Sequence, residues 1–270
     1  MKFENPDIDE DINISKEHPL KEFFQLLAGV SFIIVIVMIL LSHTAQYFAR
    51  KIPFSYESSL LSHVDSLVVK KSDRQQKLQD LANRLSQYMD LPGGMNITVH
   101  YSEEDTVNAY ATLGGHVFFF RGLVEKMPSE NALAMVMAHE IAHIKYRHPI
   151  VAMGKGVTML VLAASVSGAS GSSAGEALIN ESLNLGLLKY SRDQESESDV
   201  EALRAIQQMY GNVQGAKELF DVLNQQAKPS TKLPELFLSH PHTDKRWEKL
   251  KQIALENGWV IQGQTTPLIF

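Results

Sequence analysis

The chain has 270 residues, 44% of them hydrophobic, which is enough for one sizeable globular domain with an appended segment. Its net charge of −6 and the lack of interleaved basic and aromatic residues exclude a nucleic-acid partner. There is no cysteine, which excludes disulfides, thiolate metal ligands and cysteine nucleophiles.

The first long element is an apolar segment. Phe23 to Leu41 carries no charged residue across 19 positions, close to the length that crosses a bilayer. A core helix of this length rarely lacks a polar face, and a signal peptide would have a shorter apolar region followed by a cleavage site. We therefore expect a transmembrane anchor at 23–42, between a polar tail at 1–22 and a linker at 43–59. Lysine and arginine flank both sides almost equally, so they do not fix the orientation.

Three short elements are expected after the linker. Between Ser72 and Asp90, a helical stripe of apolar residues predicts a packing helix. The members of this stripe are Leu78, Leu81, Ala82, Leu85 and Met89. Residues 97–101 and 115–121 read as two short β-strands.

The motif that carries chemistry is His139-Glu140-Ile141-Ala142-His143, inside a run of helix-forming residues. On a helix, positions i and i+4 share a face, so both imidazoles can reach one ion, while Glu140 lies where it can reach a water on that ion. This is the arrangement of zinc peptidases, with two ligands and a general base. Ser129 suits the start of this helix, which is apolar almost all round and belongs in a core. A metal there would satisfy side chains that are otherwise costly to bury.

A catalytic zinc takes a third protein ligand. The extended motif H-E-x-x-H-x-x-G-x-x-H would place a glycine and a histidine where the chain has Tyr146 and Pro149, so the ligand must come from further along. The best candidates are Glu195 and Asp199, one helical turn apart in an acidic segment. One of them could bind the metal while the other orients a histidine. The alternative is a solvated acidic helix face.

Two segments lie between this motif and the acidic run. The apolar stretch 156–166 is too short to span a bilayer, so we expect a buried or membrane-grazing helix. The glycine- and serine-rich stretch 168–175 could act as a lid or hinge. Further helices are expected at 176–209, 213–227 and 244–256. The expected fold class is therefore mainly α (α+β), with a small β-sheet.

The order of these motifs resembles a known family. His139 to His143, followed by Ser191-Arg192-x-x-Glu195-x-x-Ser198-Asp199, is similar to the pattern of the HtpX, BepA, Oma-type and CAAX prenyl protease family of zinc metallopeptidases. Residues 108–119 resemble the family's strand before the active-site helix. Residues 239–246 resemble its C-terminal S-H-P-x-T-x-x-R element. The resemblance covers about residues 60 to 255.

The resemblance implies a zincin-like metallopeptidase domain at 60–258 and a C-terminal tail at 259–270. Anchored bacterial relatives keep a short N-terminal tail in the cytoplasm. This implies an inner-membrane protein with a single span at 23–42 and a periplasmic peptidase domain. It further implies one Zn²⁺ per chain, with His139, His143 and Glu195 as ligands, Asp199 as the residue that orients a histidine ligand, and Glu140 as the general base.

His240 precedes Pro241, a setting typical of a turn residue. Pro241 biases His240 towards an extended backbone and restricts where its ring points, and neutral imidazole is a good zinc ligand. In BepA-like relatives the matching histidine can reach the metal and displace the water, so we predict that His240 gates the site. The alternative is that His240 stays near the metal and donates to the oxyanion.

Together these features predict a membrane-anchored zinc endopeptidase that hydrolyses unfolded or misassembled polypeptides in envelope protein quality control. A substrate could add to the edge of the strand at 115–120 through main-chain hydrogen bonds, at a site formed by Asn108, Gly115, His116 and Val117. One alternative is a chaperone or assembly factor whose zinc site is latent and gated by His240. Another is a structural membrane protein in which the H-E-x-x-H sequence is accidental.

Overall fold

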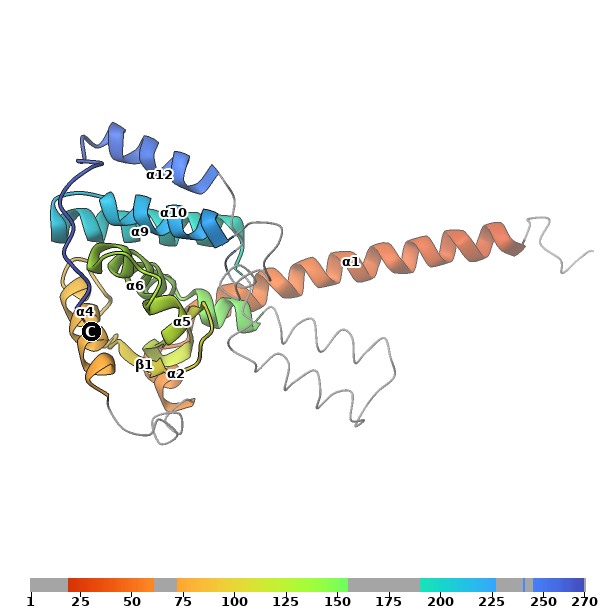
Figure 1. Cartoon of the computed structure of the whole chain (residues 1–270). Helices are drawn as coiled ribbons and strands as arrows, with labels where there is room; N and C mark the ends of the chain where they lie inside the picture. The colour runs from red at the N-terminus through yellow and green to blue at the C-terminus, as the bar shows by residue number, and fades with distance from the viewer. Residues whose placement is uncertain (1–18, 61–71, 155–189, 227–239, 241–244, 270) are drawn as a thin grey trace, which may run out of the picture. The chain divides into compact units, whose positions relative to one another are not determined.

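The computed structural model describes residues 19–60, 72–154, 190–226, 240 and 245–269 (Figure 1). The chain divides into two compact units, with the boundary between Thr44 and Ala45. The predictions for 156–166, for 168–175 and for the first part of the helix at 176–209 fall outside the described residues.

The N-terminal helix α1 runs from Pro19 to Lys51. Its stretch Leu20–Leu41 spans 22 residues with a mean hydropathy of 2.8, and none of it is buried inside the protein. A helix of this length and composition is able to cross a membrane. The predicted N-terminal apolar helix is therefore confirmed. Much of the expected linker at 43–59 is also helical, because α1 continues into it as far as Lys51 and α2 begins at Phe54.

The stripe predicted between Ser72 and Asp90 forms helix α4, Asp73–Ser86. The Ser72 hydroxyl caps this helix by accepting a hydrogen bond from the backbone N–H of Gln75 at 3.1 Å. The apolar residues of the stripe are buried in the main core as expected: Leu78, Leu81, Ala82, Leu85 and Met89.

Three short strands form one sheet in the order β1-β3-β2. Strand β1 is Thr98–Ser102, β2 is Ala109–Ala111 and β3 is His116–Phe120. β3 pairs in parallel with β1 along its whole length and antiparallel with β2. A 3₁₀ turn, η2 (Leu113–Gly115), joins β2 to β3.

This strand order corrects one prediction. The strand expected to offer an edge to substrate, at 115–120, is the central strand β3, so both of its edges are occupied within the described sheet. Gly115 lies in the turn η2 instead of the strand, with φ of 85°. A Cβ added to Gly115 would lie 2.0 Å from the backbone oxygen of Asn96, so glycine permits a close backbone approach here.

Helix α6, Glu130–Lys145, runs through the core of the second unit, with every residue from Asn131 to Ile144 buried. Helices α9 (Arg192–Tyr210) and α10 (Gln214–Gln226) cover one side of α6, and the sheet and α4 lie on the other (Figure 1). Helix α12 (Lys245–Glu256) packs outside α9 and α10, and the short α5 (Arg121–Val124) follows β3. The predicted mainly helical α+β fold is confirmed.

The expected C-terminal tail, 259–270, packs against the folded unit along its described part. The backbone oxygen of Thr266 accepts a hydrogen bond from the N–H of Glu130 at 2.9 Å. The backbone N–H of Thr266 donates to Asn131 Oδ1 at 2.8 Å. Further back, the N–H of Val213 donates to the Val260 oxygen at 2.8 Å. The tail thereby satisfies one of the N–H groups that are unpaired at the start of α6.

Candidate metal centre

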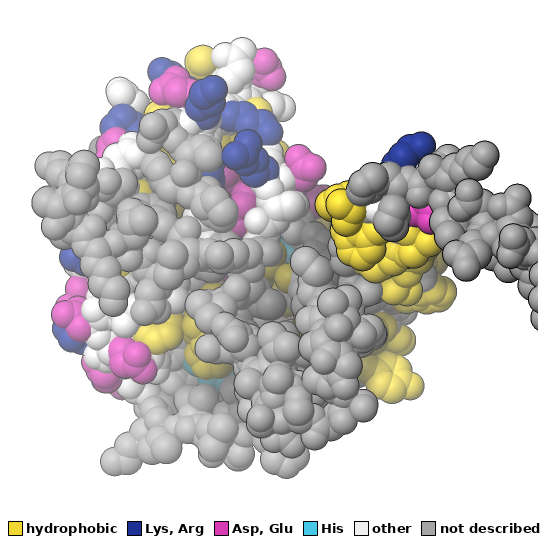
Figure 2. Space-filling view, turned by 90° about the vertical axis from the view of Figure 1, so that its right-hand side faces the viewer, with side chains coloured by type: hydrophobic (Ala, Val, Ile, Leu, Met, Phe, Trp, Pro, Cys, Tyr) yellow, Lys and Arg dark blue, Asp and Glu magenta, His cyan; other side chains and the backbone are white. Residues whose placement is uncertain are grey.

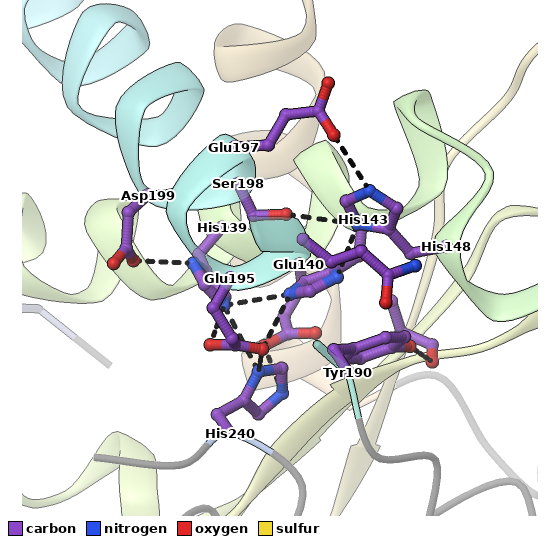
Figure 3. A network of polar contacts seen from close by, with 12 residues as sticks. His139, Glu140, His143, His148, Tyr190, Glu195, Glu197, Ser198, Asp199 and His240 are labelled. Atoms are coloured by element: carbon purple, nitrogen blue, oxygen red, sulfur yellow. Dashed lines mark hydrogen bonds and ion pairs between the residues drawn. The ribbon is translucent and has the colours of Figure 1, made fainter. Parts of the chain in front are cut away.

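Helix α6 presents His139 and His143 on one face, as the i, i+4 spacing predicts. Their Nε2 atoms lie 3.0 Å apart (Figure 3). The register of the helix is set at its start, where the Ser129 hydroxyl accepts a hydrogen bond from the Ala132 N–H at 3.0 Å. Both histidines are buried, and so is the intervening Glu140.

Helix α9 supplies the acidic residues. Its start is fixed by a reciprocal capping pair in which Ser191 accepts from the Gln194 N–H and the Gln194 side chain accepts from the Ser191 N–H. Glu195 and Asp199 follow one turn apart and are buried against α6. The Glu195 carboxylate lies 3.6 Å from His139 Nε2 and 3.5 Å from His143 Nε2. The acidic run is therefore not a solvated face at these two positions.

His240 reaches the same point from a non-helical residue before α12. Its Nδ1 lies 2.8 Å from Glu195 Oε1 and 3.2 Å from His139 Nε2. Its Nε2 lies 3.4 Å from Glu140 Oε1. His240 is 3% exposed, so the ring is enclosed by the cluster and is not a surface turn residue.

Four side chains thus converge: His139, His143, Glu195 and His240 each offer one atom, and all four atoms lie within 4.8 Å of one another. Several buried polar atoms around this point have no hydrogen-bond partner in the described part of the chain, namely both oxygens of Glu140, Glu195 Oε2 and His240 Nε2. Leaving such atoms unpaired is costly. A cation with a water would satisfy them, so the residues present fit a metal.

Asp199 and Arg246 support the cluster from behind His139. Asp199 Oδ1 lies 3.0 Å from His139 Nδ1, and Arg246 donates to both oxygens of Asp199 at 2.6 and 2.8 Å. Burial acts to raise the pKa of Asp199, but Arg246 and His139 outweigh it and hold the pKa well below its usual range. Asp199 therefore stays ionised and keeps an anion beside the ring.

Glu140 has the opposite electrostatic setting. Burial raises the pKa of its carboxyl, and the neighbouring His240 and His139 oppose that shift only partly. The peptide group of Ala111, in strand β2, also acts to lower it. A carboxylate with a raised pKa next to the cluster is a suitable acceptor for a proton.

Three further residues contact this site, and their place in the sequence did not indicate it: Arg246, Tyr190 and His148. Arg246 is the last residue of the C-terminal element at 239–246. Its hydrogen bonds to Asp199 follow from the fold and not from the local sequence. The Tyr190 ring stacks on His143 with centroids 3.9 Å apart, and its hydroxyl donates to the Ala111 oxygen at 3.4 Å. His148 lies one position before the place where the extended motif would have a histidine, and its Nδ1 lies 2.9 Å from His143 Nδ1.

The residues predicted to bind a substrate strand form contacts within the sheet and the core. The His116 ring nitrogen Nδ1 lies 2.8 Å from His100 Nε2, and Val117 is buried in the core. The backbone oxygen of Asn108 accepts a hydrogen bond from the Phe120 N–H at 3.2 Å. With Gly115 in the turn η2, none of the four lies on a free edge of β3 within the described sheet, so the expected β3 edge is wrong. A contact of these residues with substrate stays a prediction.

Comparison with known proteins follows the same division of the chain. The model for peptidase family M48 matches residues 72–254. The chain is 30% identical over 156 residues to mitochondrial metalloendopeptidase OMA1 of Schizosaccharomyces pombe, covering 57% of this chain and 45% of that protein. It is 30% identical over 157 residues to the beta-barrel assembly-enhancing protease of Escherichia coli, covering 53% and 31%.

A third relative, metalloprotease YcaL of Escherichia coli, is 26% identical over 152 residues, covering 54% of this chain and 57% of that protein. The matches thus span about a third to somewhat over half of the relatives' length. The family match spans more than half of this chain and includes His139 to His143 and Glu195. The chain belongs to peptidase family M48.

Proposed function

We propose that this protein is a membrane-anchored zinc endopeptidase, with His139, His143 and Glu195 as its metal ligands and Glu140 as its general base. The observation that carries the proposal is the convergence of these residues, from two helices, on one buried point, where neither Glu140 oxygen has a hydrogen bond from the described residues. Membership of family M48 and relatives named as metalloendopeptidases support it.

The distances are compatible with a tetrahedral zinc. Nitrogen and oxygen ligands lie about 2.0–2.1 Å from a tetrahedral zinc, which places them about 3.3 Å from one another. Five of the separations among the four donor groups run from 2.8 to 3.6 Å, and one atom from each of the four residues fits within 4.8 Å. Two histidines and a carboxylate are also the ligand types of several catalytic zinc sites.

The chain's own residues then divide the work of hydrolysis. A bound zinc would lower the pKa of its water towards 7 and polarise the substrate carbonyl. Glu140 accepts the proton of the attacking water, because its raised pKa brings it closer to the operating pH. Glu140 later delivers that proton to the leaving amine. Asp199 orients the His139 ring through Nδ1, 3.0 Å away.

Strand β2 takes the place that was first assigned to β3 in substrate binding. The backbone oxygen of Asn108 and the backbone N–H of Thr112 form hydrogen bonds with β3. In an antiparallel pair only every second residue bonds to the partner strand, so the peptide groups of Ala109 and Ala111 face the other edge of β2. The Ala111 oxygen accepts the Tyr190 hydroxyl, and its peptide group acts on Glu140, so this edge borders the metal centre. A polypeptide added there would be recognised mainly through its backbone.

His240 gates the site in this proposal. With His240 included, the metal would have four protein ligands, the closed set typical of structural zinc, whereas catalytic zinc keeps one position for water. His240 must therefore withdraw before a substrate carbonyl can approach. His240→Ala should raise basal casein cleavage. If His240 instead donates to the oxyanion, the same change should lower kcat by about 100-fold or more.

The central test uses the full chain purified in detergent. The wild-type protein should contain one zinc per chain by elemental analysis and should cleave casein. Glu140→Gln should keep the zinc and abolish cleavage, whereas Glu195→Ala should lose both. Stoichiometric zinc without any cleavage, in both wild type and His240→Ala, would instead favour the second candidate, a chaperone or assembly factor with a latent zinc site. The closed four-residue ligand set is the observation that favours this second candidate.

The biological setting is a further part of the proposal. The helix at Leu20–Leu41 would anchor the protein in a bacterial inner membrane with the peptidase domain in the periplasm, where misassembled envelope proteins would be its substrates. The relatives named for β-barrel assembly support an envelope role. An alkaline phosphatase fusion after Phe270 should be active. An inactive fusion that is nevertheless expressed would place the peptidase domain on the cytoplasmic side.

A further inference from the structure

The two histidines proposed as ligands have different partners on their far side (Figure 3). His139 Nδ1 faces the carboxylate of Asp199 directly. His143 Nδ1 faces another imidazole, His148, at 2.9 Å. His148 Nε2 in turn lies 3.2 Å from Glu197 Oε2. Both imidazoles are fully buried, while the Glu197 side chain is 49% exposed, so the series leads from the metal centre to the surface.

The positions of the protons in this series follow from metal binding. A histidine that binds metal through Nε2 must carry its proton on Nδ1. The Nδ1–H of His143 therefore donates to His148 Nδ1, which must be unprotonated. The remaining proton of a neutral His148 then lies on Nε2 and points at Glu197. Each hydrogen bond thus fixes one tautomer.

The backbone places His148 where a regular helix would not. At 100° per residue, position 148 on a continuous helix would be rotated by about 140° from position 143. The chain instead leaves α6 at Tyr146, and Arg147 adopts a φ of 62°, a left-handed conformation that is unfavourable for a residue with a side chain. Such strain persists where the surroundings enforce it, often at functional sites.

Contacts of the Arg147 side chain hold its backbone in this left-handed conformation. Its guanidinium donates to Glu57 Oε1 of α2 at 2.5 Å and to the Ile52 oxygen at 2.6 Å. Glu57 also accepts the Gly114 N–H at 3.3 Å. The left-handed turn is therefore clamped by contacts to α2, and it turns His148 back against His143.

We propose that His148 is a positioning residue for the metal ligand His143, accepting the proton of His143 Nδ1 and donating its own Nε2 proton to Glu197. This inference rests on the zinc site proposed above. It assigns His148 no contact with substrate. Its effect is on the orientation and tautomer of the ligand, and such partners typically change metal affinity by about 10–100-fold.

The test compares two amide variants of matched chemistry in the full chain. In His148→Asn, the side-chain oxygen can take the place of Nδ1 and still accept from His143. In His148→Gln, the amide lies instead near the position of Nε2 and leaves Nδ1 without a counterpart. We expect zinc affinity, measured by competition with a chromophoric chelator, to stay within about threefold of wild type for Asn and to fall about 10- to 100-fold for Gln.

Glu197 separates charge from hydrogen bonding in the same assay. Glu197→Gln keeps an oxygen that can accept from His148 Nε2, so its zinc affinity should stay near that of the wild type. Glu197→Leu removes the acceptor and should weaken zinc binding, but less than His148→Gln, because Glu197 is half exposed and acts one ring further from the ligand. Equal zinc affinities for the Asn and Gln variants of His148 would overturn the proposal.

A second measurement does not depend on zinc or on proteolysis. In metal-free wild-type protein labelled with ¹⁵N-histidine, the Glu197 carboxylate still only accepts, so NMR should show His148 protonated on Nε2 and His143 protonated on Nδ1. The reverse tautomer at either ring would refute the inference even if the protein is an active zinc peptidase. Conversely, the expected tautomers in a protein that binds no zinc would uphold the ring contacts and reject the proposed metal function. This measurement also decides the matter if the His148 variants fail to fold.

Discussion

Neutralising Glu201 should loosen the contact between the two helices that carry the proposed metal ligands. Glu201 lies on α9 and accepts hydrogen bonds from Lys145 of α6 at 2.8 Å and from Arg204 at 2.7 and 3.2 Å. The Tyr146 hydroxyl also donates to it, at 3.4 Å. The Glu201 residue is only 6% exposed. It therefore forms a buried anion at the α6–α9 interface.

The magnitude for Glu201→Gln follows from the two cationic donors. A hydrogen bond to a charged group contributes about 1.5–3 kcal/mol, and a neutral one about 0.5–1.5 kcal/mol. The amide oxygen can keep the bonds from Lys145 and Arg204 to Oε1 but not the charge, so each of these two cations loses about 1 kcal/mol. The amide nitrogen cannot accept the second Arg204 bond, at the former Oε2. We expect the free energy of unfolding at pH 7 to fall by about 2 kcal/mol.

The pH dependence gives this prediction its sign. Burial acts to raise the pKa of Glu201, but hydrogen bonds from Arg204 and Lys145 outweigh it and hold the pKa below its usual range. A carboxyl with a lowered pKa in the folded state stabilises above its unfolded pKa of about 4.3 and loses that stabilisation as the pH falls through its folded pKa. The difference between wild type and Glu201→Gln should therefore be constant from pH 7 to about 5 and shrink below about 4.

The assay is urea unfolding of the metal-free full chain in detergent, followed by tryptophan fluorescence. The two tryptophans, Trp247 and Trp259, lie in α12 and in the tail, so the signal reports on the folded unit. The control is Asp221→Asn, which removes an exposed ion pair with Lys217 and should cost less than about 0.5 kcal/mol. A loss at Glu201 no larger than that of the control, or one that persists unchanged at pH 3, would refute the reasoning.

Three further changes test the elements around the site, each by the same unfolding assay. Ser129→Ala removes the cap of α6 and should cost about 1 kcal/mol, while Ser129→Thr should cost less. Gly215→Ala would put a Cβ 2.3 Å from the backbone oxygen of Asn131 and should cost about 1–3 kcal/mol; no loss would mean that α10 can shift away from α6. Arg147→Ala breaks the ion pair with Glu57 and keeps the left-handed strain, whereas Arg147→Gly breaks the pair and relieves the strain. The glycine variant should therefore be the more stable by about 1 kcal/mol, and the reverse order would contradict the backbone argument.

Features that repeat along one helix were predicted well from the sequence. The spacing of His139 and His143 defines one face of α6 whatever surrounds it, and the 19-residue run without charge defines an apolar helix by composition alone. The family resemblance selected Glu195 and His240 as neighbours of the motif, and both lie in the cluster. Their assigned roles as ligand and gate stay predictions.

Features that depend on long-range pairing were not predictable in the same way. Strand β2 has three residues, too few for a periodic pattern. It pairs with β3 on the side opposite β1, so β3 is the central strand and the edge expected to bind substrate is occupied. The role of His148 depends on one left-handed residue, Arg147, whose conformation is stabilised by Glu57, 90 positions away. Neither local spacing nor helical periodicity carries that information.

The order of the cluster along the chain has a consequence for biosynthesis. His139 and His240 are 101 positions apart, and the start of α6 is satisfied by Thr266, further on still. At about 5–20 residues per second, a ribosome needs on the order of 5–20 s to pass from the first of these histidines to the second. During that interval the nascent chain has the H-E-x-x-H helix but lacks His240. It also lacks the hydrogen bond from the Glu130 N–H to the Thr266 oxygen at the helix start. Metal captured early would thus be held by fewer ligands and released more readily, so stable loading belongs to the finished chain.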